Sequence, residues 1–117
     1  MIYNWGYNNC YDGTKSYINW ANNYYKSGPG TSSGVRDRIF QLSDAPVDPE
    51  NEGWELSNTF TTSLYAEGNY LVGFPSVTAN NWAGGVDFDN GSSEESNRVL
   101  TPAFSAPDIT ETTAEEV

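Results

Sequence analysis

Residues 18–39 read INWANNYYKSGPGTSSGVRDRI. The stretch opens as a half-apolar strand, and Asn22 and Asn23 follow it directly although strands disfavour asparagine. Asparagine tolerates the left-handed backbone conformation that a sharp turn requires. We therefore expect Asn22 and Asn23 to form a turn and not to continue the strand.

Asparagine recurs where other short strands are expected to end. Tyr3-Asn4-Trp5, Ile18-Asn19-Trp20 and Asn80-Asn81-Trp82 share an Asn-Trp pair. When successive turns of a coiling chain stack, like residues lie above one another, and stacked asparagine amides can hydrogen-bond along the stack. The pattern indicates a solenoid with asparagine at its turns.

The rest of the sequence reads as short strands separated by turn residues. Helical periodicity is interrupted everywhere by glycine, proline or asparagine, except in 112–117, which reads as the start of a helix. We expect strands 17–21 and 36–42 to pair in parallel, one turn of the solenoid apart. The full set of expected strands is 2–3, 17–21, 36–42, 59–65 and 70–72.

Composition excludes several classes of protein. The 117 residues suffice for one domain at most, and the hydrophobic fraction of 37% includes much tyrosine and tryptophan, which argues against helical bundles. A net charge of −11 with five cations would repel nucleic acids and anionic membranes, and no apolar run could span a bilayer. With no histidine, histidine-based catalysis and histidine-ligated zinc are excluded. Cys10, the single cysteine, is expected to face the interior.

Three segments of the sequence stand out together: IYNWGYNNCYDG (2–13), YINWANNYYKSGPGTSSGVRDRI (17–39) and YAEGNYLVGFPSVTANNWAGGV (65–86). They closely resemble, in the same order, segments of secreted pectate lyases of the polysaccharide lyase superfamily. The family pattern has a YNWG strand, an NNYYKPGP turn, a VRDRI strand, a GNY segment and a TxxNW loop. The resemblance runs from residue 1 to about residue 86, and the acidic remainder follows more loosely.

The resemblance implies an all-β fold, a right-handed parallel β-helix with long loops. Residues 1–86 would supply C-terminal rungs of this partial solenoid, and 87–117 an acidic tail that packs along it and ends inside a helix signal. It also implies a secreted, extracellular protein of pectin degradation, with calcium as cofactor and polygalacturonate as partner, cleaved by β-elimination. Asn90-Gly91-Ser92 is in addition a glycosylation acceptor triplet, as expected of a secreted glycoprotein.

The family's catalytic arginine and calcium-binding aspartates lie upstream of the segments that match. The arginine belongs to an Arg-x-Pro-Arg stretch, and this sequence contains none. We therefore expect the parent to be a pectate lyase and this chain alone to be inactive, with neither a catalytic residue nor a calcium ligand of its own.

Four residues are candidates for substrate binding: Lys26, Tyr24, Arg36 and Arg38. Lys26 could pair with a galacturonate carboxylate while Tyr24 stacks on the sugar ring; the alternative is a solvated lysine beside packed tyrosines. Arg36 and Arg38, expected on a strand, would either bind carboxylates bidentately or form salt bridges with Asp37 or Asp44.

Two acidic segments are candidate metal sites, and neither matches a known calcium-binding pattern in full. The run Asp87-Phe88-Asp89-Asn90-Gly91 resembles the opening of a calcium loop, but its glycine falls one place early and no glutamate closes it. An acidic loop could gather a cation or simply keep the surface solvated; its candidates are Asp44, Asp48, Glu50 and Glu52. At least two of the tryptophans are expected to be buried, among Trp5, Trp20, Trp54 and Trp82.

A second hypothesis for this chain is a non-catalytic module, either carbohydrate-binding or self-assembling, in which aromatic residues and asparagine ladders serve recognition or stacking. Residues Ile2–Trp5 would form an open strand edge with strong β-propensity and few charges. We expect this edge to pack against the N-terminal part of the parent or against another copy of the chain.

Overall fold

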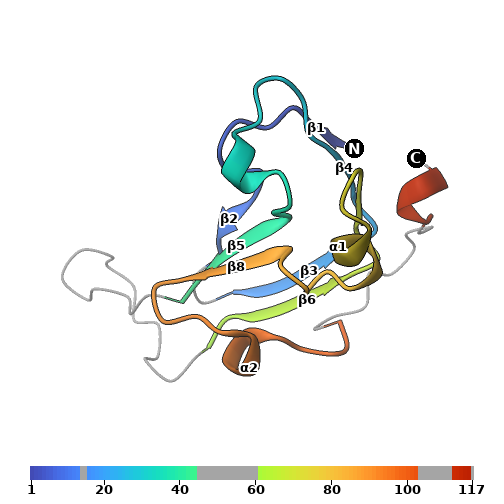
Figure 1. Ribbon diagram of the computed structural model, residues 1–117. Helices are drawn as coiled ribbons and strands as arrows, with labels where there is room; N and C mark the ends of the chain where they lie inside the picture. Colours follow the sequence, from blue (N-terminus) through green and yellow to red (C-terminus); the bar gives the residue numbers. More distant parts are fainter. Residues whose placement is uncertain (14–15, 45–60, 103–111, 117) are drawn as a thin grey trace.

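The computed structural model describes residues 1–13, 16–44, 61–102 and 112–116 (Figure 1). These residues form mostly strands with a few short helical segments, which confirms the expected all-β class. The strands are β1 (Ile2–Tyr3), β2 (Tyr11–Asp12), β3 (Tyr17–Ala21), β4 (Tyr24–Lys26), β5 (Phe40–Ser43), β6 (Ser63–Glu67), β7 (Tyr70–Leu71) and β8 (Val86–Asp89). The helical segments are η1 (Ser33–Val35), α1 (Pro75–Ala79), α2 (Glu94–Asn97) and η2 (Ala114–Glu116).

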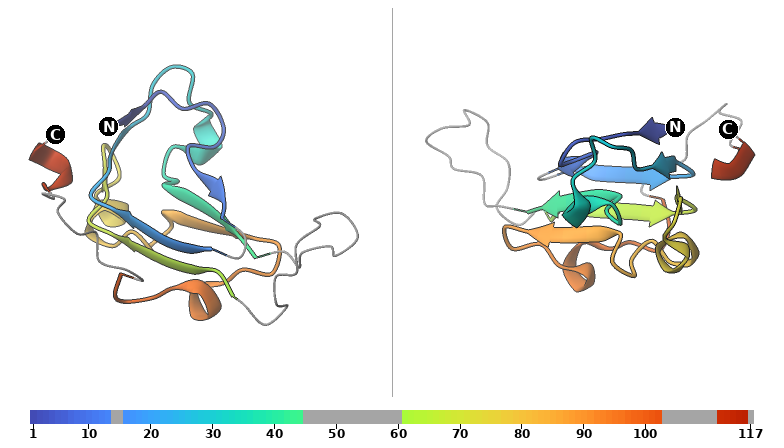
Figure 2. Two further views of the ribbon diagram at one scale, coloured as in Figure 1. Left: turned by 180° about the vertical axis from the view of Figure 1, so that it is seen from behind. Right: turned by 45° about the horizontal axis from the view of Figure 1, so that its top comes forward.

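The strands pair in parallel throughout the described part of the chain. They form three sheets with the orders β1-β4-β7, β2-β5-β8 and β3-β6, and Figure 2 shows their strands in layers. Consecutive strands lie in different sheets: the chain passes through the three sheets with β1 to β3, passes through them again with β4 to β6, and then adds β7 and β8. Tyr17 pairs with Ser63 and Tyr24 with Tyr70, each 46 positions apart.

The expected pairing of 17–21 with 36–42 is wrong. β3 pairs with β6, whereas β5 pairs with β2 and β8. The reason is that strands of two other sheets intervene before the chain returns to the sheet of β3. The strand expected to start at residue 36 begins only at Phe40, because η1 precedes it and the Arg38 N–H donates to the carbonyl of Val35.

Two short helices were not expected from the sequence. α1 begins at Pro75. Proline has no backbone N–H, but the N–H groups of a helix's first turn make no helical hydrogen bond, so none is lost here. α2 is capped by the Ser93 hydroxyl, which accepts from the N–H of Ser96 at 3.1 Å. Within 112–117, where the sequence reads as the start of a helix, η2 forms over Ala114–Glu116. The boundary expected after residue 86 falls inside β8.

No helix of the described segments has the length and apolar character needed to span a membrane.

Alternating residues of the strands turn into a common core. Phe40 and Leu42 of β5 are buried, as are Leu64 and Ala66 of β6, which is the two-residue period of a strand with one buried face. Trp5 and Trp82 are buried, so the expectation of at least two buried tryptophans is confirmed; Trp54 lies outside the described residues. The remaining buried apolar residues are Tyr25, Val35, Ile39, Leu71, Val77, Val86 and Ala114.

Asparagine occupies the turns, as the sequence indicates. Asn22 adopts a left-handed backbone with φ of 57°. The next residue, Asn23, donates through its N–H and its Nδ2 to Asn69 Oδ1, at 3.0 and 2.9 Å. Asn69 donates in the same way to Asn81 Oδ1, with both distances 3.0 Å. The three side chains therefore form a hydrogen-bonded amide ladder, two of whose members are fully buried.

The turn of Asn22 lies directly against that of Gly68, which has a φ of 69°. The Asn22 N–H donates to the carbonyl of Glu67, and a Cβ at position 68 would collide with Asn22 Oδ1. Glycine is thus required here for both its conformation and its lack of a side chain.

Gly68→Ala is expected to lower the free energy of unfolding by about 1–3 kcal/mol, because alanine is strained at positive φ and would displace Asn22. Gly34→Ala is the matched control, since a Cβ there meets no atom within 4 Å. Urea unfolding of both variants measures the difference. Equal losses in the two variants would contradict this account of the turn.

Candidate functional site

The outer face of the β1-β4-β7 sheet gathers tyrosines and one lysine. Tyr25 of β4 is buried, so its neighbours Tyr24 and Lys26 point to the opposite side of the sheet. Tyr24 stacks on Tyr70 of β7 with ring centroids 5.3 Å apart and planes 6° apart. Tyr3 of β1 is in register with Lys26 and is 58% exposed. We call Tyr3, Tyr24, Lys26 and Tyr70 the tyrosine–lysine face.

The ammonium of Lys26 is exposed and makes no ion pair within the described residues. It follows Tyr24 by two positions on one strand, which places the two side chains about 7 Å apart along the same face. An aromatic ring beside a cation can hold a ligand that presents an apolar surface next to an anionic group.

The two arginine candidates are not joined to this face. Arg38 forms an ion pair with Asp87 at 3.1 Å, donates to Asn8 Oδ1 at 2.9 Å and lies over the ring of Tyr7. Arg38 therefore has a salt bridge, with Asp87 in place of the expected Asp37 or Asp44. Arg36 is exposed, and its Nε donates to a backbone carbonyl at 3.4 Å. Among the described residues, no hydrogen bond, ion pair or ring contact links either arginine to Tyr24 or Lys26.

Among the acidic residues expected as possible metal ligands, those that the structure describes have protein partners. Asp44 Oδ1 accepts from the N–H and hydroxyl of Thr62, and its Oδ2 accepts from Asn97. Asp87 forms an ion pair with Arg38. Asp48, Glu50 and Glu52 lie outside the described residues. Over the described ranges, no group of three or more histidine, cysteine or acidic residues is placed to hold a metal ion.

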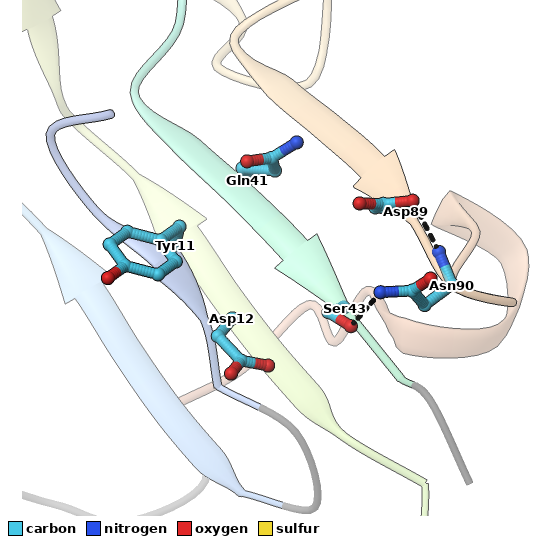
Figure 3. Close-up of a pocket in the computed structure, with 6 residues that line it drawn as sticks. All are labelled: Tyr11, Asp12, Gln41, Ser43, Asp89 and Asn90. Carbon is cyan, nitrogen blue, oxygen red and sulfur yellow. Dashed lines mark hydrogen bonds between the residues drawn. The ribbon is translucent and has the colours of Figure 1, made fainter. Parts of the chain in front are cut away.

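A polar pocket of about 180 Å³ lies on the β2-β5-β8 sheet (Figure 3). Asn90 closes one side: its Nδ2 donates to the Ser43 hydroxyl at 3.1 Å, and its N–H donates to Asp89 Oδ1 at 2.8 Å. Sequence reasoning missed this pocket, because only the register of three strands brings its residues together. The lining residues are Tyr11, Asp12, Gln41, Ser43, Asp89 and Asn90.

Asn90 is also the residue of the glycosylation triplet. Its side chain is exposed, but Nδ2, the atom that would carry a glycan, donates to Ser43 inside the pocket. Glycosylation at Asn90 stays a prediction, and a glycan attached there would have to replace this hydrogen bond.

Comparison with known proteins adds no family. No protein-family model matches the sequence, and no curated protein matches it at a significant level.

Cys10 is half-buried and packs against the core, in line with its expected inward orientation. Burial raises the pKa of its thiol, and a hydrogen bond with the backbone of Tyr11 offsets part of this effect. A raised pKa means that less reactive thiolate is present at any given pH.

Iodoacetamide should therefore alkylate Cys10 more slowly in the native chain than in urea, and the native rate should begin to rise only at a higher pH. Mass spectrometry of timed samples over a pH series measures both rates. Identical pH profiles for the native and unfolded chains would show that Cys10 is not held as described.

Proposed function

We propose that this chain is part of a pectate lyase-like polysaccharide lyase and binds polygalacturonate through the tyrosine–lysine face. The observation that carries the proposal is the stacked pair of Tyr24 and Tyr70 with Lys26 on the same side of the sheet. A galacturonate residue has an apolar ring face and a carboxylate, which match a tyrosine ring and an ammonium. Tyr24 and Lys26 also belong to the NNYYKSGP turn, on which the resemblance to pectate lyases rests.

We further propose that the three sheets belong to a right-handed parallel β-helix. The parallel pairing, the repeated separation of 46 positions and the asparagine ladder support this fold. The right hand is the one adopted by about 98% of connections between parallel strands of one sheet. The proposed secretion and the proposed dependence on calcium rest only on the resemblance to pectate lyases.

The proposed role of this chain is binding and not catalysis. Elimination from a uronate requires a cation to neutralise the substrate carboxylate and a base near C5. The chain lacks the Arg-x-Pro-Arg stretch that carries the family's base. The base and the calcium ligands would come from the upstream part of the parent.

Binding can be tested by titrating the isotope-labelled chain with trigalacturonate and following its amide resonances. Lys26→Gln should weaken binding about two- to fivefold, which is the range of an exposed ion pair, and added salt should reduce the difference. Tyr24→Ala should weaken binding as well, through the loss of ring stacking.

Tyr17→Ala is the control, because Tyr17 is an exposed tyrosine, at 57%, on a different sheet. The proposal is wrong if Lys26→Gln and Tyr24→Ala bind trigalacturonate as the unaltered chain does.

Activity provides a separate test. Incubated with polygalacturonate and calcium, this chain alone should release no unsaturated product, since it lacks the family's catalytic arginine. The ultraviolet absorbance of the unsaturated uronide measures this directly. A rise in absorbance that a chelator abolishes would show that the catalytic groups lie within this chain.

A second candidate function, a self-assembling module, is favoured by one specific observation. Tyr3, Tyr11 and Tyr17 are each more than half exposed and lie on β1, β2 and β3, the outermost strands of their sheets in the described part of the chain. Unpaired strand edges beside exposed aromatic rings can pair with another strand. The proposed partner is a second copy of the chain, or the upstream part of the parent, at the Ile2–Trp5 edge.

Light scattering over a concentration series tests self-assembly. The mass should rise with concentration, and Tyr3→Lys should suppress the rise by placing a charge on the edge. A monomer at every concentration would exclude pairing between copies.

A further inference from the structure

The pocket on the β2-β5-β8 sheet offers a set of hydrogen-bonding groups that the tyrosine–lysine face does not. Asp12 ends β2, Gln41 and Ser43 come from β5, and Asp89 ends β8. Figure 3 shows the side chains of Asp12 and Asp89 on either side of Ser43. Adjacent parallel strands, about 4.8 Å apart, hold these groups at fixed spacings.

Most of the atoms available in the pocket are hydrogen-bond acceptors. Asp89 Oδ1 accepts from Asn90, and in Figure 3 its other oxygen points away from that residue. Gln41 donates through Nε2 to Asp87 at 3.3 Å, so its oxygen stays available. A ligand for this pocket must therefore bring several donors, and a uronate or phosphate would be repelled by the two carboxylates.

Ser43 gives an independent sign that a ligand belongs here. It is only 7% exposed, and its hydroxyl accepts from Asn90 Nδ2. A hydroxyl is also a donor, and no acceptor among the described residues takes the proton of Ser43. A buried donor that lines a pocket without an acceptor favours a ligand that carries an oxygen as well as donors.

We propose that this pocket binds one neutral sugar residue. Sugar hydroxyls supply the donors that Asp89 and Gln41 require and an acceptor for Ser43. Tyr11, 65% exposed at the rim, can lie against the apolar face of the sugar ring. A metal ion is the less suitable ligand, since no group of three or more metal-binding side chains converges over the described ranges.

The size of the pocket limits the ligand to a single residue. About 180 Å³ is well below the roughly 300 Å³ at which pockets for larger organic ligands begin. The open rim beside Tyr11 would let neighbouring sugars of a chain extend into solvent. The tyrosine–lysine face would then bind an acidic sugar, and the pocket on the β2-β5-β8 sheet would bind a neutral one.

The test is a titration of the full, isotope-labelled chain with methyl galactoside, methyl glucoside and methyl xyloside, followed through the amide resonances. At least one of these should shift the amides of Gln41 and Asp89 at millimolar concentration. Asp89→Asn keeps an oxygen for the Asn90 N–H but removes the charge, and should weaken binding about fivefold. Tyr11→Ala should weaken it by a similar factor, and Tyr17→Ala on β3 should not.

Three outcomes would overturn the proposal: no shift with any of the three glycosides, shifts that Asp89→Asn and Tyr11→Ala leave unchanged, or shifts at Gln41 and Asp89 caused by calcium chloride and not by glycosides. The last outcome would make the pocket a cation site. The trigalacturonate titration is scored separately at Tyr24 and Lys26, so failure of one site leaves the other standing.

Discussion

The amide ladder of Asn23, Asn69 and Asn81 is the interaction on which the arrangement of the sheets depends. It joins the residue before β4, the turn before β7 and the segment after α1, although these lie up to 58 positions apart. Asn69 Nδ2 also donates to the carbonyl of Trp20, and Asn81 Nδ2 donates to the carbonyls of Asn69 and Val77. A buried polar network of this kind stabilises only when all its members are satisfied, so it permits one register of the layers and penalises the others.

Local chemistry could be predicted from the sequence, and long-range register could not. The turn at Asn22 was predictable because the left-handed backbone conformation depends on the residue type at that one position. The alternation of Tyr24, Tyr25 and Lys26 likewise indicates which side chains share a face once a strand is assumed. The partner of β3 was not predictable, because it is set by the length of the intervening chain and not by any residue of β3. For the same reason the pairing of Arg38 with Asp87 and the pocket of Ser43 emerged only from the structure.

Charge is distributed unevenly along the chain. Residues 1–43 contain four cations and two acids, whereas residues 44–117 contain one cation and fourteen acids. The tyrosine–lysine face takes three of its four residues from the first part, and Arg98, the one cation of the second part, is held by Glu67 and Glu94. The cations are thus concentrated in the first part of the chain, and the large excess of negative charge in the second part disfavours indiscriminate binding of polyanions.

The separation of paired strands has a consequence for how the chain folds. Every strand pair in the described residues is parallel, and the nearest in sequence, Ile2 with Tyr25, are 23 positions apart. No hairpin among these residues can therefore serve as a local nucleus. The entropy of closing such loops is modest at equilibrium, since each doubling of length costs about 0.6 kcal/mol, but chains dominated by distant contacts fold slowly. During synthesis, β3 must wait for β6 to emerge, and its edge stays open to other strands for that whole interval.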